Sequence, residues 1–394
     1  MTMKFAKRME RLQASEIREL LKLTQKPEII SFAGGLPAPE LFPVEELAKV
    51  SADVLKSEGR QLLQYATTEG RPSLRKKIAD RMLAKYNTKV SPDEILITTG
   101  SQQCLDFAGK LFLDPGDVVL CESPSYLGAL NAFNAYEPNF VEVPTDDGGL
   151  IPEELDKILS TTDRCKFIYV IPDFQNPTGR TWSMERRTKF MEVVNKHNLP
   201  VLEDNPYGEL RFEGEILPSL KSMYTKGLVM FLGTFSKIFC PGLRLGWVAA
   251  IPEVLSEFVK IKQSADLHTS NFDQGLADAY IENYDLDAHV EQIKALYKHR
   301  RDVIIESMEK MMPEGVKWTH PEGGLFLWLT FPQGVSAAQV FVKCIEKNVA
   351  GVTGDAFFPN GKTDRNMRIN YSNMPDEKIV EGIRRMSEAI KESM

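Results

Sequence analysis

The sequence has few cysteines, no long apolar run and no block of like charge, and each absence excludes a class of protein. The five cysteines, at positions 104, 121, 165, 240 and 344, show neither CxxC nor zinc-ligand spacing. An odd and scattered set is typical of reduced thiols in a cytosolic protein rather than of a disulfide framework. We therefore expect free thiols and no metal site.

Charge and hydropathy exclude further classes. The chain carries 48 basic and 55 acidic residues, a net charge of −7, which argues against binding to nucleic acid or to an anionic membrane surface. The N-terminal stretch MTMKFAKRMERLQASEIRELLKL is too charged for a signal peptide, and no apolar run approaches the length of a membrane span. We expect a cytoplasmic protein without a membrane or nucleic-acid partner.

Two common nucleotide-binding motifs are also missing. No GxGxxG occurs, so the dinucleotide fingerprint is absent. The segment GDAFFPNGKT is similar to a P-loop, but Gly354 and Gly361 are seven positions apart where a P-loop has five. Neither a dinucleotide nor a nucleoside triphosphate is therefore predicted as a cofactor.

What the sequence does contain is an alternation of helical segments with short apolar runs. A chain of 394 residues exceeds the size at which a single core stops growing, so two domains or one large α/β domain are expected. Seven runs are rich in β-branched residues: EILITTG, DVVLCES, NFVEVP, CKFIYVIP, LPVLEDNPY, GLVMFLGTFS and LGWVAAI. This alternation predicts an α/β fold with a mainly parallel seven-stranded sheet and helices on both of its faces.

The segments outside this alternation predict a smaller α+β part. RLQASEIRELLKL has the spacing of an amphipathic helix, and IISFAGGLPAPELFP then breaks regular structure. Long helical segments follow about residue 252, and the stretch from GGLFLWLTF to NMRINYS predicts short strands packed with helices. We predict an N-terminal helix and arm at 1–44 that belongs to the small domain, a large domain at 45–285 and a C-terminal small domain at 286–394.

Polar residues follow several of the predicted strands. Ser101 is the predicted N-cap of the helix after TTG, where free backbone amides bind phosphate or another anion. Later strand ends carry Tyr126, Asn176, Asp204 and Tyr207. Taken singly, each is more often a turn residue or an ordinary cap than a site residue. Because ligands of parallel sheets bind beyond the carboxyl ends of the strands, the set together predicts one site.

The stretch GTFSKIFCPGLRLGW, residues 233–247, adds reactive chemistry to this set. Lys237 taken alone is most simply a surface lysine on a loop. Beside the other strand ends, however, it supplies an amine for an aldehyde, while Tyr126 can stack on a flat ring and Asp204 can bind a ring N–H. A second set of phosphate partners comes from Thr234, Ser236 and Arg244. An aldehyde, a ring N–H and a phosphate together indicate pyridoxal phosphate as the cofactor.

The chain resembles fold-type-I, class I/II pyridoxal-phosphate aminotransferases, in particular the branch of 2-aminoadipate, kynurenine and broad-specificity aromatic enzymes. The resemblance runs from about Arg11 to the C-terminal helix. It is carried by SFAGGLPAPELFP, QYATTEGRPSLR, TTGSQQ, PSY, FQNPTG, EDNPYGEL, GTFSKIFCPGLRLGW and MRINYS. One departure is Asn205, which stands where many relatives have a second acid in EDDPY.

The resemblance implies a role for each matching residue. Lys237 would form the Schiff base with the cofactor and carry a proton, which requires cationic neighbours and desolvation that lower its pKa. Asp204 would keep the pyridine nitrogen protonated, and Tyr126 would stack on the ring. Asn176 and Tyr207 would contact the 3-oxygen of the cofactor. The phosphate would be bound by Ser101, Gln102, Thr234, Ser236, Arg244 and, across a homodimer, Tyr65. The substrate would be contacted by Gly35, Asn176, Arg368 and Arg18.

The implied activity is an aminotransferase with two ping-pong half-reactions, from amino acid to 2-oxo acid and then from 2-oxoglutarate to glutamate. Arg368 would bind the α-carboxylate, and Arg18 the distal carboxylate of an acidic substrate. The donor stays open among 2-aminoadipate, aromatic and branched-chain amino acids, because side-chain selectivity depends on pocket shape. Two alternatives remain: a β-lyase on the same fold, or a non-catalytic regulator, for which we expect no room for a DNA-reading domain before residue 11.

Overall fold

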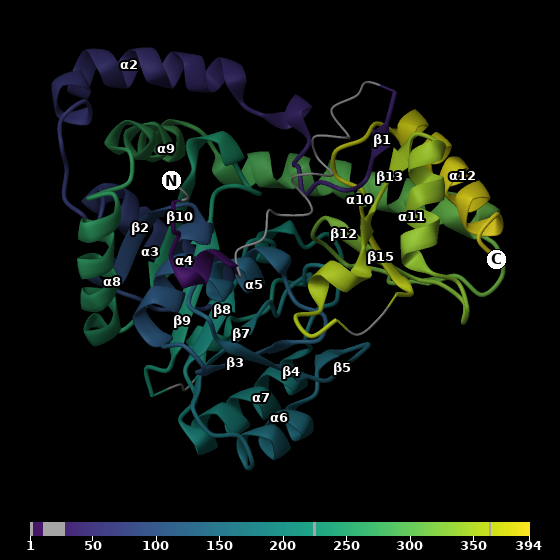
Figure 1. The fold of residues 1–394 in the computed structure, drawn as a ribbon. Helices are drawn as coiled ribbons and strands as arrows, with labels where there is room; N and C mark the ends of the chain where they lie inside the picture. The colour runs from purple at the N-terminus through teal and green to yellow at the C-terminus, as the bar shows by residue number, and fades with distance from the viewer. Residues whose placement is uncertain (1–2, 11–27, 224–225, 362–363) are drawn as a thin grey trace.

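Seven strands form the central sheet of the molecule in a computed structural model that describes residues 3–10, 28–223, 226–361 and 364–394. They are β2 (Ile95–Thr99), β3 (Val118–Glu122), β4 (Asn139–Val143), β7 (Cys165–Val170), β8 (Val201–Asp204), β9 (Val229–Thr234) and β10 (Leu245–Ala249). Their order is β2-β10-β9-β8-β7-β3-β4 (Figure 1). Only β10 runs antiparallel to its neighbours in this sheet. The predicted mainly parallel seven-stranded sheet is therefore confirmed.

Helices cover both faces of this sheet. One face carries α4 (Ser101–Phe112), α5 (Leu127–Asn134) and α8 (Pro252–Ala265), and the other carries α6 (Pro152–Leu159) and α7 (Met184–His197), which lie below the sheet in Figure 1. Successive strand residues point to opposite faces. Phe167 and Tyr169 of β7 accordingly pack edge-on against Phe133 of α5, whereas Ile168 lies in a separate core with Phe190 of α7.

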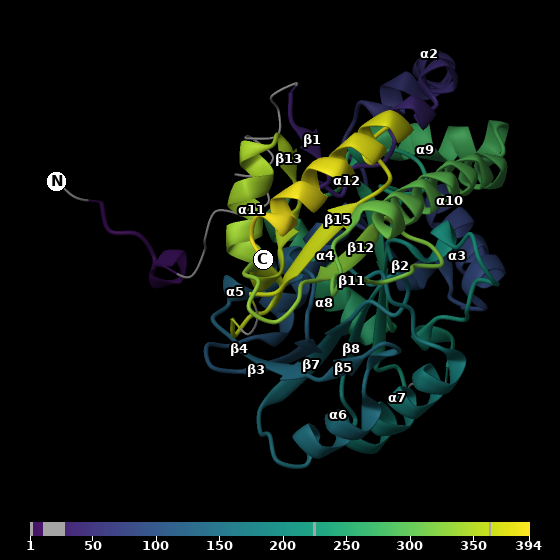
Figure 2. The same cartoon turned by 90° about the vertical axis from the view of Figure 1, so that its right-hand side faces the viewer.

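Three further helices lie at the edge of the sheet next to β2: α2 (Val44–Leu62), α3 (Pro72–Tyr86) and α9 (Asn271–Asn283). The long helix α2 crosses α9 at the outside of the molecule (Figures 1 and 2), where Val50 and Val54 pack against Leu276. In the residues that the structure describes, no helix combines the length and the apolar character needed to span a membrane.

A second, antiparallel sheet occupies the C-terminal part, with the order β11-β12-β15-β14. Its elements are β11 (Lys317–Trp318), β12 (Phe326–Thr330), β14 (Val352–Thr353) and β15 (Asn366–Asn370), next to α10 (Leu286–Met311), α11 (Ala337–Glu346) and α12 (Asp376–Lys391). The short strand β1 (Ile30–Ser31) pairs in parallel with β13 (Val349–Ala350), so this strand from before α2 joins the C-terminal part (Figure 2). The small hairpin β5 (Thr145–Asp146) and β6 (Gly149–Leu150) completes the strands.

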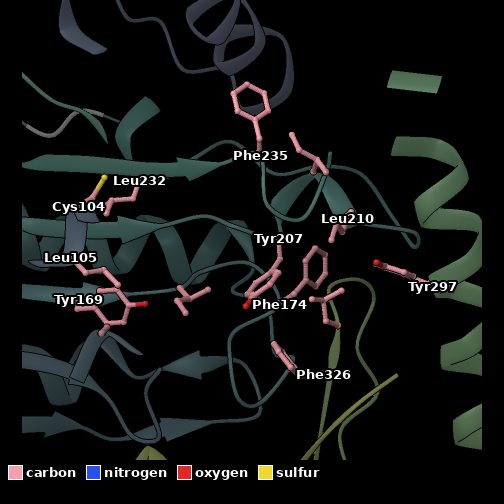
Figure 3. Close-up of a cluster of buried hydrophobic side chains, with 14 of the residues drawn as sticks. Cys104, Leu105, Tyr169, Phe174, Tyr207, Leu210, Leu232, Phe235, Tyr297 and Phe326 are labelled. Atoms are coloured by element: carbon pink, nitrogen blue, oxygen red, sulfur yellow. The ribbon is translucent and has the colours of Figure 1, made fainter. Parts of the chain in front are cut away.

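A cluster of buried hydrophobic side chains, several of them aromatic, connects the two sheets (Figure 3). Tyr169 belongs to the central sheet, Phe326 to the second sheet, and Tyr207 to the loop between β8 and β9. The rings of Tyr207 and Phe326 meet edge-on with their centroids 5.9 Å apart. The two sheets therefore share a packed junction at the carboxyl end of the central strands.

The start of α4 differs from the prediction that Ser101 is its N-cap. The helix begins at Ser101 itself, and Gly100 is the N-cap, with φ 72°. Glycine adopts a positive φ without a steric penalty, which a serine at the cap could not do. A side chain at position 100 would also collide with Arg244, because its Cβ would lie 2.4 Å from the guanidinium. The positive φ at this position thus selects glycine as the cap, because the exposed end of the Arg244 side chain could move aside.

Candidate active site

A cavity of about 500 Å³ opens where the central strands end and meet the second sheet. It is lined by most of the residues predicted from the sequence: Gly35, Ser101, Gln102, Tyr126, Asn176, Asp204, Tyr207, Thr234, Ser236, Lys237, Arg244 and Arg368. Tyr65 lies outside the cavity on an exposed loop after α2, and Arg18 falls outside the described residues. Side chains from residue 35 to residue 368 thus converge on one place.

Asp204 is the last residue of β8 and is buried. Its Oδ2 accepts a hydrogen bond from the hydroxyl of Tyr169 at 2.8 Å. Its Oδ1 is also buried and has no hydrogen-bond partner among the described residues. Burial raises the pKa of Asp204 to about 7, and the bond from Tyr169 partly opposes this rise. A buried carboxylate oxygen without a partner is suited to an N–H donor of a ligand.

Lys237 follows β9 and places its amine in the same cavity. Its Nζ donates a hydrogen bond to the backbone oxygen of Gly35 at 2.7 Å. Burial, together with the positive charges of Arg368 and Arg244, lowers the pKa of Lys237 to about 8. A larger neutral fraction than that of an ordinary lysine makes this amine a better nucleophile and base near neutral pH.

Arg368 lies in β15, and its side chain is 1 % exposed. Its guanidinium donates to Asn176 Oδ1 at 2.8 Å and to the backbone oxygen of Ala33 at 2.6 Å, and it lies 4.3 Å from the centroid of the Phe326 ring. Burial lowers the pKa of Arg368 to about 10, and the nearby phenols of Tyr207 and Tyr126 partly oppose this shift. Among the described residues, no carboxylate is paired with this guanidinium. A buried guanidinium without a carboxylate partner is suited to a carboxylate of the substrate.

Asn176 connects this arginine to Tyr207. Its Oδ1 accepts from Arg368, and its Nδ2 lies 3.4 Å from the hydroxyl of Tyr207. Burial raises the pKa of Tyr207 and also that of Tyr126, the N-cap residue of α5. Both phenols are therefore neutral hydrogen-bond donors at physiological pH.

A second part of the cavity carries hydroxyls, helix-start amides and a guanidinium. The hydroxyls of Thr234 and Ser236 lie 2.9 Å apart. The first backbone amides of α4 belong to Ser101 and Gln102 and have no acceptor within their own helix. Arg244 is exposed at the same edge. Helix-start amides together with a guanidinium favour a phosphate or another anion.

Sequence reasoning missed two residues of this site, Tyr169 and Phe326. Both occur in apolar strand segments, CKFIYVIP and GGLFLWLTF, where an aromatic residue is first interpreted as part of the core. Their partners, Asp204 and Arg368, lie far away along the chain. The one available signal was the hydroxyl of Tyr169, because a tyrosine in a buried strand usually needs a hydrogen-bond acceptor.

Comparison with known proteins identifies the family of this chain. The model of the family described as aminotransferase class I and II matches residues 28–386. The chain belongs to this family. It is 46% identical over 387 residues to aromatic-amino-acid aminotransferase 1 of Thermococcus litoralis, with 97% of this chain and 93% of that protein covered. The family that the sequence motifs indicated is therefore confirmed.

Solved structures of aminotransferases superimpose on the whole chain. The kynurenine aminotransferase of Pyrococcus horikoshii in complex with PMP is 42% identical, with 99% and 97% of the two chains covered and a TM-score of 0.95. The α-aminoadipate aminotransferase of Thermus thermophilus, complexed with N-(5'-phosphopyridoxyl)-L-leucine, is 41% identical, with 98% and 97% covered and a TM-score of 0.92. This aminotransferase therefore has the type I fold and depends on pyridoxal phosphate.

The cavity of the aminotransferase is chemically complementary to this cofactor. The bare Oδ1 of Asp204 is placed to accept from a ring N–H, and Lys237 offers an amine for the aldehyde. The hydroxyls, the helix-start amides and Arg244 match a phosphate dianion. Groups of the type needed by the ring N–H, the aldehyde and the phosphate thus lie in this one cavity.

Proposed function

We propose that this cavity is the active site and that the enzyme transfers the α-amino group of an amino acid to 2-oxoglutarate in a ping-pong reaction. One observation carries the proposal: the amine of Lys237, the bare carboxylate oxygen of Asp204 and the buried guanidinium of Arg368 line a single cavity. When bound, pyridoxal phosphate supplies an aldehyde that reacts with amines and a protonated ring that withdraws electrons from the substrate α-carbon.

Asp204 holds a proton on the ring nitrogen in this proposal. A cationic partner at Oδ1 favours the ionised carboxylate and so lowers the pKa of Asp204 from its raised value. Tyr169 keeps Oδ2 occupied, which leaves Oδ1 for the ring. Asn176 and Tyr207 donate to the 3-oxygen, and Tyr126 packs against the ring face, where aromatic stacking contributes about 0.5–1.5 kcal/mol.

Lys237 would hold the cofactor through its amine, and the same amine, when free, would move a proton at the substrate α-carbon. Its lowered pKa leaves part of the amine neutral, so it can accept the proton from the substrate α-carbon. Arg368 binds the substrate α-carboxylate, which orients the α-carbon toward Lys237. Gly35, whose backbone oxygen already contacts the amine of Lys237, borders the substrate closely. The phosphate is held by Ser101, Gln102, Thr234, Ser236 and Arg244.

The donor is 2-aminoadipate, an aromatic or a branched-chain amino acid. The names of the similar enzymes from Thermus thermophilus and Thermococcus litoralis support the first two classes, and the complex of the Thermus thermophilus enzyme with N-(5'-phosphopyridoxyl)-L-leucine supports the third. Among the described residues, the cations that line the cavity are Lys237, Arg244 and Arg368, and each already has a proposed role. The distal carboxylate of an acidic substrate therefore needs another partner, for which Arg18 remains our prediction.

We also propose a homodimer in the cytoplasm, with Tyr65 of one subunit reaching the phosphate at the other. Tyr65 is 79 % exposed, and its ring meets His268 edge-on with centroids 5.9 Å apart. All five cysteines lie in the described part of the chain, and no disulfide joins them, which suits a reducing compartment. The division of the subunit at 1–44, 45–285 and 286–394 is part of the same proposal.

A panel of amino donors with 2-oxoglutarate, followed by glutamate release, tests the activity. We expect glutamate from at least one of 2-aminoadipate, phenylalanine, tyrosine and leucine, and loss of the visible absorbance of the bound cofactor on adding donor, with recovery on adding 2-oxoglutarate. A β-lyase would cleave its substrate without a 2-oxo acid, and the absorbance change would not be reversed by one. The absence of glutamate with every donor would overturn the proposal.

The role of Arg18 has its own test. Arg18→Gln should raise KM for 2-aminoadipate and 2-oxoglutarate about tenfold or more, since a charged hydrogen bond contributes roughly 1.5–3 kcal/mol. The half-reaction with leucine or phenylalanine should change little. Equal losses with acidic and apolar substrates would show that Arg18 serves the fold instead.

A further inference from the structure

Asn205 stands between Asp204 and Tyr207 and is 5 % exposed. Its Nδ2 donates a hydrogen bond to Asp173 Oδ2 at 3.1 Å, and its Oδ1 accepts from the backbone N–H of Gly208 at 3.0 Å. The first bond reaches the loop after β7, and the second closes the loop after β8. One buried amide therefore connects the two loops that carry the proposed ring contacts.

The orientation of this amide follows from its partners. The N–H of Gly208 can only donate, so it requires the oxygen of Asn205 on its side. An ionised Asp173 can only accept, so it requires the NH₂ group on the other side. One orientation of the amide therefore makes both hydrogen bonds, and the flipped orientation makes neither.

The charge of Asp173 is balanced by an arginine on the side opposite Asn205. Arg187 of α7 donates a hydrogen bond to Asp173 Oδ1 at 2.6 Å. Arg187 is 0 % exposed and Asp173 is 2 % exposed. The guanidinium also donates to the backbone oxygens of Trp182 at 3.1 Å and Pro218 at 2.9 Å. One buried cation and one buried anion therefore balance each other, and Asn205 completes the bonding of the anion without adding charge.

We propose that Asn205 is a positioning residue that joins the loop after β7 to the loop after β8, and that its neutral amide is required because Asp173 already carries the negative charge of the network. Asp173 precedes Asn176 by three residues, and Asn205 precedes Tyr207 by two. The bond between them thus fixes the spacing of Asn176 and Tyr207, whose side chains lie 3.4 Å apart in the cavity. The consequence for catalysis rests on the ring contacts proposed above.

The ionisable groups around the network are engaged elsewhere. They are Glu203, which accepts from the backbone of Leu220 and Lys221; Glu209, which pairs with Arg81; Asp204, which accepts from Tyr169; and Tyr86, which lies beside Gly208. Among the described residues, Arg187 is the cation that pairs with Asp173. A second carboxylate at position 205 would therefore face Asp173 without a cation of its own.

The substitution Asn205→Asp tests this requirement. Burial and the neighbouring Asp173 would raise the pKa of the new carboxyl group, so its unfavourable effect should be small at low pH and should grow as the pH rises. We expect the Tm of the cofactor-free variant to fall increasingly below that of the parent between pH 5 and pH 9. We also expect kcat/KM and the affinity for pyridoxal phosphate at pH 8.5 to drop about tenfold or more, with partial recovery at pH 6.

The reciprocal double variant Asn205→Asp with Asp173→Asn is the matched control. It keeps one carboxylate and one amide, so Arg187, the amide at 173 and the N–H of Gly208 can all remain bonded. We expect it to recover most of the loss and to lose the added pH dependence. Gln292→Glu, which also replaces an amide with a carboxylate but at an exposed position of α10, should leave the Tm, activity and cofactor affinity at the parent values.

Two results would overturn the proposal: an Asn205→Asp variant that matches the parent at every pH, or a double variant that is no better than the single one. If Asn205→Asp does not fold, recovery of folding by the double variant still supports the pairing, and failure of both contradicts it. The Tm of the cofactor-free protein does not depend on the reaction. A parent without transaminase activity would therefore reject the proposed function and leave the positioning test intact.

Discussion

The part of the active-site cavity proposed for the ring and the substrate (the ring part) is more buried than the part proposed for the phosphate (the phosphate part). Asp204, Asn176 and Arg368 are 2, 3 and 1 % exposed, and Asn176 links Arg368 to Tyr207 by hydrogen bonds. Gln102 and Arg244, proposed for the phosphate, are exposed. The ring needs donors and acceptors held in fixed directions by a desolvated core. A phosphate can be bound by more open groups, some of which a second subunit can supply.

The ring part of the cavity also contains buried polar atoms without hydrogen-bond partners in the described part of the chain. Asp204 Oδ1 and Arg368 Nε are buried and have no hydrogen-bond partner among the described residues. Such atoms lower the free energy of unfolding, by about 1–3 kcal/mol each and more for charged groups. The ring part of the cavity is therefore unfavourable without its ligands, and binding of cofactor and substrate removes that cost. The predictions below separate the contributions of the two parts, beginning with the largest expected effect.

Lys237→Ala should break the ring part at its reactive centre. We expect kcat to fall at least about 10³-fold, because both the covalent link to the cofactor and the proton-transfer base are lost. Pyridoxal phosphate should still bind noncovalently through the remaining contacts, which equilibrium dialysis can measure. Lys260→Ala, at an exposed lysine of α8, is the control and should keep full activity. Substantial turnover by Lys237→Ala would assign the catalytic amine to another residue.

Asp204→Asn should separate activity from stability. We expect kcat to fall about 10²-fold or more, because an amide does not hold a proton on the ring nitrogen. Without cofactor the variant should be more stable than the parent at pH 8. Burial raises the pKa of Asp204 to about 7, so the stability that this carboxyl contributes is present at low pH and is lost as the pH rises toward 7.

The corresponding measurement is the Tm of both cofactor-free proteins at pH 5 and pH 8. Asparagine does not ionise, so the variant should exceed the parent by about 2 °C or more at pH 8 and by less at pH 5. Near-normal turnover would mean that another acid binds the ring nitrogen. A lower Tm than the parent at pH 8 would contradict the unfavourable burial of the charged form.

Arg368→Lys should affect substrate binding more than cofactor binding. A lysine cannot reproduce the planar, two-pronged contact with a carboxylate, so we expect KM for the amino donor to rise about 10–100-fold. The Kd for pyridoxal phosphate should change by much less. Equal losses in both quantities would show that Arg368 acts through Asn176 on the cofactor rather than on the substrate.

Tyr65→Phe should cause the smallest effect and should test whether a second chain completes the phosphate part. Loss of one hydroxyl should weaken cofactor binding about 3–10-fold, in keeping with a single hydrogen bond. Hybrids of Tyr65→Phe and Lys237→Ala subunits should contain one site with a normal lysine and a normal tyrosine, and its cofactor affinity should equal that of the parent. A fully active monomer in sedimentation would contradict the shared site.

Sequence reasoning predicted the sheet and the cavity lining because both follow from local signals. The apolar runs fixed the strands, and residues such as Asp204 and Lys237 directly follow those runs, so a parallel sheet brings them to one edge. The predicted N-cap of α4 was wrong because the chain takes a positive φ at Gly100, a backbone conformation that the capping preference of serine does not reveal. Tyr169 was missed because its partner lies on the neighbouring strand β8.

Asn205 illustrates a further limit. The sequence showed an amide where many relatives have an acid, but its significance depends on Asp173 and Arg187, which come from two other segments. Charge balance in a buried network cannot be read from one segment, because it is a property of all the groups that meet there. The parts of the site that sequence could predict are those in which each residue contacts the ligand directly.

The most direct test of the account is borohydride reduction of the cofactor-loaded enzyme followed by peptide mass mapping. Reduction makes the link between the lysine and the cofactor permanent, so the modified peptide identifies the active-site amine. The account predicts one phosphopyridoxyl group per chain, on the peptide that contains Lys237, and none when an excess of amino donor is added before reduction. A modified lysine in any other peptide would contradict it.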